Sequence, residues 1–161
     1  MNETMDRDSD RYAAALALTK RERLLDLSTI DEAGYPETRA LFNLLAMRAE
    51  ALSSGLAKPP ADFATYIATN ASSRKMALVR ANPRACLYYC DRANFEGCSV
   101  RGTLVEVADP AIKRAIWTPE WEMYYYGGFE GGDFAVLRFD PGQVRYYHGL
   151  SVSEWKVGKD R

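Results

Sequence analysis

The sequence is poor in histidine and cysteine, has no excess of charge of either sign, and contains no long apolar run. Its only histidine, His148, excludes a metal site built from several histidines of one chain and limits histidine-based acid–base catalysis to one residue. The sequence has 21 Lys and Arg residues and 22 Asp and Glu residues, which gives a formal net charge of −1. Proteins that bind nucleic-acid phosphates usually carry a basic surface instead. We therefore expect no metal site and no nucleic-acid partner.

The three cysteines, Cys86, Cys90 and Cys98, form an odd set without a CxxC pair, unlike the dense and even sets of secreted disulfide scaffolds. We expect reduced, buried thiols, because free cysteine packs as a small apolar residue. The N-terminal segment 1–11 is charged and lacks the apolar part of a signal peptide, and no run is long enough to span a bilayer. These features predict a cytoplasmic protein without a membrane partner.

The composition, 47% hydrophobic and 27% charged, is typical of a globular protein, and the length fits one domain spanning 1–161. We expect an N-terminal helix over about 7–25 and a polar tail over about 149–161. Helices are also expected over 72–81 and from the Asp109-Pro110 pair onward, where a capping residue precedes a proline at the first helical position.

Short apolar runs separated by turns predict strands, and the first two should form a hairpin around the turn 31–36. The expected strands are 25–31, 38–47, 63–69, 85–90, 98–107, 134–139 and 143–147. Helices do not alternate regularly with these strands, so the pattern favours an α+β barrel over a doubly wound sheet. The segment 48–61 is expected to be a loop, and its length is typical of functional or mobile loops.

The segment 67–75, Ile-Ala-Thr-Asn-Ala-Ser-Ser-Arg-Lys, carries the strongest chemical signal. It passes from an apolar strand through short polar residues into a helix whose first turn contains Arg74 and Lys75. Cations oppose the partial positive charge of a helix N-terminus, unless an anion such as a phosphate is bound there. The alternative is that Ser72 or Ser73 simply caps the helix while the two cations face solvent.

A third cation, Arg39, lies in the segment Thr38-Arg39-Ala40-Leu41, inside an otherwise apolar predicted strand. An arginine in a strand usually faces solvent. It would take part in an anion site only if its side chain reached the same anion as Arg74 and Lys75.

The order of these motifs resembles the pyridoxamine 5′-phosphate oxidase-like flavoproteins, in particular their small general-stress-protein branch. The matching pieces are the TRAL strand at 38–41, TN-x-SSRK at 69–75, Asn82-Pro83, RGTLVEV at 101–107, Ile116-Trp117, FAVLRFDP at 134–141 and VRYY at 144–147. The resemblance covers about residues 24–149.

This resemblance implies a mainly antiparallel split β-barrel with a few flanking helices that binds FMN and forms a homodimer with the flavins at the subunit interface. By position, Arg39, Arg74 and Lys75 would hold the FMN phosphate, with Thr69 and Ser73 as hydrogen-bond donors. Ala40 and Leu41 would pass one side of the flavin ring, and Thr69 and Asn70 the other.

The sequence departs from the oxidases themselves at their substrate residues. Nothing in 149–161 matches their RxH motif, and 121–126 lacks their arginine with a serine four positions on. A glutamine that contacts the flavin in the oxidases aligns with Gly97. Vitamin B6 is therefore not the expected substrate.

We predict an FMN-dependent oxidoreductase that uses a small-molecule substrate or an electron donor such as NAD(P)H. The alternatives are a non-catalytic flavin carrier or stress-linked sensor, and the same barrel with haem, FAD or a deazaflavin. One histidine weakens the haem alternative, and FAD needs room for its adenylate. The aromatic residues between 117 and 129 are expected either to line a cleft or to pack at a dimer interface: Trp117, Trp121, Tyr124, Tyr125, Tyr126 and Phe129.

Overall fold

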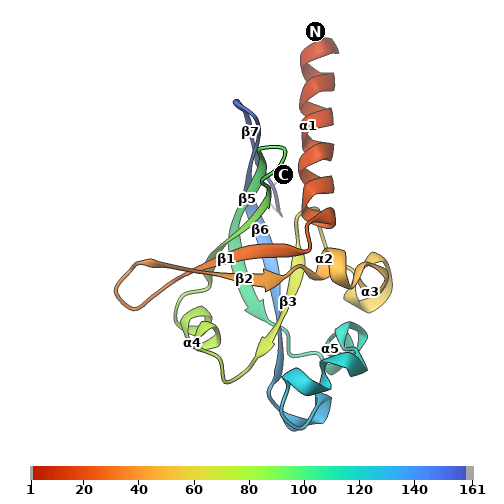
Figure 1. Ribbon diagram of the computed structural model, residues 1–161, viewed down its shortest axis with the longest axis vertical. Helices are drawn as coiled ribbons and strands as arrows, with labels where there is room; N and C mark the ends of the chain where they lie inside the picture. The colour runs from red at the N-terminus through yellow and green to blue at the C-terminus, as the bar shows by residue number, and fades with distance from the viewer. Residues whose placement is uncertain (1, 159–161) are drawn as a thin grey trace.

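The computed structural model describes residues 2–158 as one curled antiparallel sheet with helices at its two ends (Figure 1). The strands are β1 (Leu24–Ile30), β2 (Pro36–Phe42), β3 (Thr65–Asn70), β4 (Arg84–Asp91), β5 (Glu96–Glu106), β6 (Phe134–His148) and β7 (Ser151–Lys156). They follow the order β2-β1-β4-β5-β6-β3, with β7 also paired to β6. The expected α+β split barrel is confirmed, with β2 and β3 as the two edges of the split.

Helices cover the ends of this sheet. α1 (Asn2–Arg21) stands at the end near β7, whereas α4 (Arg74–Ala81) and α5 (Pro110–Ile116) lie at the opposite end (Figure 1). The short segments α2 (Leu44–Met47), α3 (Ala49–Ser53) and η1 (Gly55–Ala57) follow β2, and η2 (Pro119–Tyr124) and η3 (Phe129–Gly131) follow α5.

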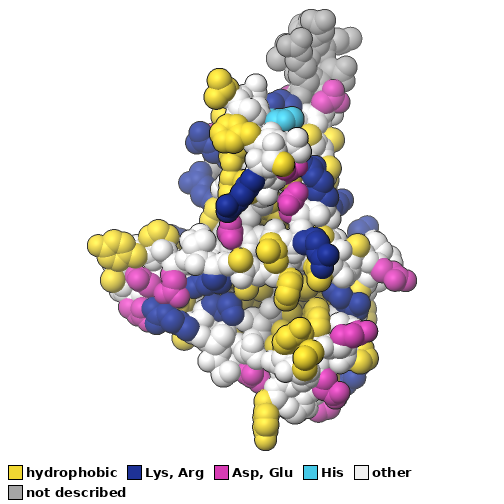
Figure 2. Space-filling model, in the orientation of Figure 1, with side chains coloured by type: hydrophobic (Ala, Val, Ile, Leu, Met, Phe, Trp, Pro, Cys, Tyr) yellow, Lys and Arg dark blue, Asp and Glu magenta, His cyan; other side chains and the backbone are white. Residues whose placement is uncertain are grey.

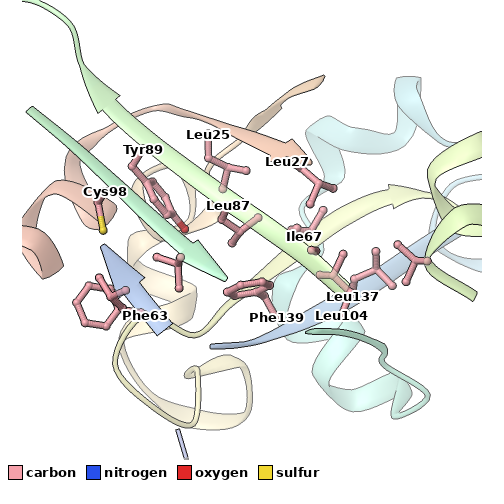
Figure 3. Close-up of a cluster of buried hydrophobic side chains, with 14 of the residues drawn as sticks. Leu25, Leu27, Phe63, Ile67, Leu87, Tyr89, Cys98, Leu104, Leu137 and Phe139 are labelled. Atoms are coloured by element: carbon pink, nitrogen blue, oxygen red, sulfur yellow. The ribbon is translucent and has the colours of Figure 1, made fainter. Parts of the chain in front are cut away.

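The core lies inside the curl because alternate residues of each strand point inward. Leu27, Leu87 and Val100 from three neighbouring strands are fully buried. Figure 3 shows this cluster, in which Leu25 and Tyr89 point towards Ile67 and Phe139 from the other half of the sheet. Such burial contributes about 1.5–3 kcal/mol for each large apolar side chain.

Polar contacts fasten α1 to the sheet. Arg11 Nε donates to Ser153 Oγ at 2.6 Å, and Arg21 Nη2 donates to Glu96 Oε2 at 2.5 Å. The buried Glu96 also accepts from the Tyr146 hydroxyl at 2.7 Å. The helix ends at Arg21, not near residue 25 as expected, because Leu24 and the next residues join the sheet.

The predicted strand 38–47 is wrong beyond Phe42. Asn43 ends it, because its side-chain oxygen accepts from the Leu45 N–H at 3.1 Å and caps α2. The predicted loop 48–61 is also partly helical, since it contains α3 and η1.

The two predicted strands 134–139 and 143–147 form one continuous strand, β6. Pro141 lies where the pairing with β5 shifts between Arg101 and Gly102, a position at which a missing N–H is tolerated. Gly102 is needed there, because a Cβ would lie 2.1 Å from the Asp140 carbonyl oxygen. The segment after Gly149, predicted as a polar tail, forms β7, and Trp155 packs against Tyr12 with ring centroids 5.4 Å apart.

Candidate functional site

The candidate site lies where the edge strand β2 faces the loop between β3 and α4. Glu37, Arg39 and Leu41 on β2 pair with Thr29, Leu27 and Leu25 on β1. The three β1 residues are buried, so their β2 partners share the inner face of the sheet. Arg39 therefore points inward at the open edge of the barrel and not into solvent.

Contacts on both sides hold the Arg39 guanidinium in place. Nη1 donates to the buried Thr29 hydroxyl at 2.7 Å, and Nη2 donates to Glu37 Oε1 at 2.9 Å. The side chain is 20% exposed, so a polar ligand at the open edge can reach it.

Lys75 approaches from the other edge of the split. Its ammonium group donates to Thr69 Oγ1 at 2.7 Å, and Thr69 Oγ1 lies 3.4 Å from Ser73 Oγ. Burial lowers the pKa of Lys75, and the positive charge of Arg39 lowers it further. The structure thus brings Arg39 and Lys75, from opposite edges, close enough to repel each other.

Arg74 completes this group of three cations, and two acids that the sequence reasoning missed contact it. Its Nε donates to Glu37 Oε2 at 3.1 Å, and its Nη2 donates to Glu32 Oε2 at 3.0 Å. Hydrogen bonding to Glu32 and Glu37 raises the pKa of Arg74. Figure 2 shows basic and acidic side chains together between the β1–β2 hairpin and α4. The sequence did contain a signal for the Glu37–Arg39 pair: the two residues are two positions apart on a predicted strand, which places both side chains on one face.

The loop before α4 differs from the simple N-terminal anion site that the sequence suggested. The Asp133 carboxylate accepts from the Ser72 N–H at 3.0 Å and from Asn70 Nδ2 at 2.8 Å, and these bonds lower the pKa of Asp133. Asn70 Nδ2 also reaches the Tyr124 carbonyl at 3.1 Å. Asp133, distant in sequence, thus fixes this loop. Ser73 is the capping residue of α4, but its hydroxyl makes no capping hydrogen bond to the helix.

An apolar cavity of about 290 Å³ lies at the end of β2, and none of the three cations lines it. Ala40 and Leu41, which follow Arg39, line it together with Ala68, which precedes Thr69. Trp121, Tyr124 and Tyr125 form the remaining aromatic wall. Burial, followed by the charge of Asp133, raises the pKa of Tyr125 to about 12, so its phenol is neutral at physiological pH.

The predicted aromatic set divides between packing and exposure. Trp117 packs against Phe134 with ring centroids 4.9 Å apart and against Phe129 at 5.7 Å. Trp121 and Tyr124 line the cavity, whereas Tyr126 is 92% exposed. The expectation of a cleft wall therefore holds for part of the set.

The remaining predicted features lie outside this site. His148 is exposed at the C-terminal end of β6. The site lies near the other end of this strand, where Ala135 pairs with Thr69. Cys98 is buried as expected, which raises the pKa of its thiol to about 12, but Cys86 and Cys90 are only half-buried because they share the outer face of β4.

Among residues 2–158 we find no group of three or more potential metal ligands. Within the same range, no helix has the length and apolar character needed to cross a bilayer.

Comparison with known proteins gives a family and several related structures. A sequence model of the family described as pyridoxamine 5′-phosphate oxidase matches residues 12–148. No curated protein sequence matches the chain. A solved structure from Clostridium acetobutylicum is described as a protein related to general stress protein 26 of B. subtilis, of the pyridoxinephosphate oxidase family. It is 26% identical, has a TM-score of 0.72, and the match covers 92% of this chain and 95% of that chain.

Two further structures share the fold at lower identity. General stress protein 26 from Bacillus anthracis is 15% identical with a TM-score of 0.67, and the match covers 91% of this chain and 98% of that chain. A heme-binding protein from Mycobacterium smegmatis is 13% identical with a TM-score of 0.62, and the match covers 91% of this chain and 57% of that chain. The fold is therefore shared by proteins described in different ways.

Proposed function

The chain belongs to the pyridoxamine 5′-phosphate oxidase family, and on this premise we propose that it is an FMN-binding flavoprotein. The observation that carries the proposal is the convergence of Arg39, Arg74 and Lys75 across the split of the barrel, together with an apolar cavity lined by Ala40 and Leu41, which follow Arg39 on β2. FMN combines the two chemistries that this arrangement suits, a phosphate dianion and a large aromatic ring.

The cations suit the phosphate because charge-assisted hydrogen bonds to phosphate oxygens are among the strongest in proteins. Arg39 and Arg74 offer guanidinium N–H groups, and Lys75 offers an ammonium group. Thr69 and Ser73 offer hydroxyls 3.4 Å apart on the same side of the split. The first N–H groups of α4 lack helical acceptors and add partial positive charge.

The cavity suits the flavin ring. In the proposed complex the backbone of Ala40 and Leu41 passes one side of the ring, and Thr69 and Asn70 lie at the other. Ligand pockets usually enclose about 300–1,000 Å³, so a cavity of about 290 Å³ is small for a complete cofactor site.

A second copy of the chain would supply the missing wall, so we also propose a homodimer with the flavins between subunits. Leu24, Phe42 and Tyr124 line the cavity and are 53–60% exposed, which is unusual for large apolar side chains that surround a ligand. Figure 2 shows apolar side chains gathered on this face.

The bound flavin would supply hydride and electron transfer, and the protein would bind, orient and shield it. We propose an FMN-dependent oxidoreductase acting on a small molecule other than vitamin B6, with NAD(P)H as a candidate electron donor. The exposed position of His148, far from the cavity, favours flavin over haem as the cofactor.

The first experiment is an absorption spectrum of the purified protein, followed by FMN and riboflavin titrations of the flavin-free form. We expect Arg39→Ala and Lys75→Ala to weaken FMN binding at least about tenfold and riboflavin binding much less, because each removes a charge-assisted bond to the phosphate. Arg80→Ala is the matched control, since Arg80 lies on the same helix but pairs with Glu106. A colourless protein that ignores added FMN would refute the proposal.

Anaerobic mixing of the flavoprotein with NADH or NADPH tests the catalytic part. Rapid bleaching of the flavin absorption is expected of an oxidoreductase that uses these donors. A flavin that neither nicotinamide reduces would instead favour a carrier or sensor.

A further inference from the structure

One carboxylate, that of Glu37, lies between two of the three cations of the candidate site. Oε1 accepts from Arg39 Nη2 at 2.9 Å, and Oε2 accepts from Arg74 Nε at 3.1 Å. A single side chain thus joins the guanidinium of a β2 residue to that of an α4 residue. This is the bridging position that a phosphate would take in the proposed complex.

The local charge is correspondingly small. Arg39, Arg74 and Lys75 contribute three positive charges, and Glu32 and Glu37 remove two, which leaves +1. Glu32 forms an ion pair with Arg74 at 3.0 Å and its side chain is 70% exposed, whereas Glu37 forms ion pairs with both Arg39 and Arg74. Of these two acids, Glu37 is the one that bridges two of the cations.

We propose that Glu37 is an internal counterion that competes with the cofactor phosphate for Arg39 and Arg74, and thereby lowers the affinity of the site for phosphate-bearing ligands. This inference rests on the proposed function of the same three cations.

Competition follows from tethering. A carboxylate on the same chain is present at high effective concentration, so it contacts the guanidinium groups whenever no stronger anion is bound. A ligand that needs those groups then binds with an apparent affinity reduced by the fraction of molecules in which Glu37 has turned away. A phosphate dianion can displace it, because three oxygens can engage both arginines and Lys75 together.

Glu37 is also able to move. It lies on the edge strand β2, its side chain is 35% exposed, and it forms ion pairs with two cations of the site, Arg39 and Arg74. Without a ligand it offsets the repulsion among three positive charges. A neutral ligand such as riboflavin does not need these guanidinium groups, so Glu37 has little effect on its binding.

The test is Glu37→Gln, which keeps the shape of the side chain and removes its charge. We expect FMN to bind about tenfold more tightly than to the unmodified protein, with riboflavin affinity changed less than twofold. Glu106→Gln is the matched control. Glu106, at the end of β5, forms an ion pair at 3.1 Å with Arg80, which lies on α4 as Arg74 does but is not one of the three cations of the site. The control should change neither affinity.

A second measurement uses inorganic pyrophosphate as the probe and needs no flavin. Added pyrophosphate should raise the melting temperature of ligand-free Glu37→Gln more than that of the unmodified protein or of Glu106→Gln. If Glu37→Gln matches the unmodified protein in both measurements, or binds FMN more weakly, the counterion proposal is overturned. If FMN and riboflavin bind equally in every variant, the FMN proposal fails, and the pyrophosphate result alone decides the role of Glu37.

Discussion

Lys75 shows how a single side chain acquires its properties from two parts of the fold. Its ammonium group is half-buried against Thr69, and its pKa is lowered first by burial and then by the charge of Arg39. The protonated form is therefore disfavoured in the ligand-free folded protein. Between the lowered pKa and the ordinary value of 10.5, the unfolded chain binds more protons, so stability rises with pH through that window.

A bound phosphate reverses this effect, because a nearby negative charge favours the protonated amine. We expect FMN affinity to fall as the pH rises through the lowered pKa of Lys75, by up to about tenfold per pH unit. Lys75→Arg should remove this step, since arginine stays protonated over the whole range. Fluorescence titrations from pH 7 to the alkaline limit of stability measure it, and identical profiles for the two proteins would contradict the assignment.

At the scale of elements, Asn43 decides where β2 ends and α2 begins. Its fully buried side chain donates to the carbonyls of Thr19 and Glu22 at 2.7 Å each and accepts from the Leu45 N–H. It therefore joins the C-terminal end of α1 to the start of α2. The sequence alone favoured a longer strand because the apolar run continues past this residue.

We expect Asn43→Ala to lower the free energy of unfolding by about 2–4 kcal/mol, since it removes a helix cap and takes a hydrogen-bond donor from the buried Thr19 carbonyl and the partly buried Glu22 carbonyl. Urea denaturation measures this loss. Ser53→Ala, which removes only an exposed hydroxyl bonded to the Glu50 carbonyl, should change it by less than about 0.5 kcal/mol. Equal losses of unfolding free energy for the two substitutions would show that the Asn43 side chain does not stabilise the connection between α1 and α2.

At the scale of the whole molecule, the exposed apolar side chains around the cavity favour assembly with a second copy. Phe42 is 60% exposed at the end of the edge strand β2 and lines the cavity. We expect Phe42→Asp to yield a monomer with strongly weakened FMN binding, because a buried charge without a partner disrupts an apolar interface.

Light scattering after gel filtration, with and without FMN, distinguishes the outcomes. Leu150→Asp is the matched control, because Leu150 is 97% exposed at the turn between β6 and β7 and should leave the oligomeric state unchanged. An unmodified protein that is monomeric and binds FMN at full affinity would refute the homodimer.

The sequence by itself determined the fold class, most of the strands, the helices that follow Ser73 and Asp109, and the family. These depend on local patterns: alternation along a strand, caps, prolines, and the order of short motifs. It also singled out Arg39, Arg74 and Lys75, since cations at a helix N-terminus and in an apolar strand are locally unfavourable.

Only the tertiary structure decided how these residues meet. Glu37 bridges two arginines, Asp133 fixes the loop before α4 from 61 residues away, and His148 lies at the far end of β6. Neither contact leaves a local pattern. The bridge to Arg74 depends on the curl that brings β2 towards α4, and the Asp133 contact depends on the pairing of β3 with β6, which are far apart in the sequence. The single histidine and the near-zero net charge, which at first only excluded functions, are therefore compatible with a concentrated cationic site that the fold assembles from separate segments.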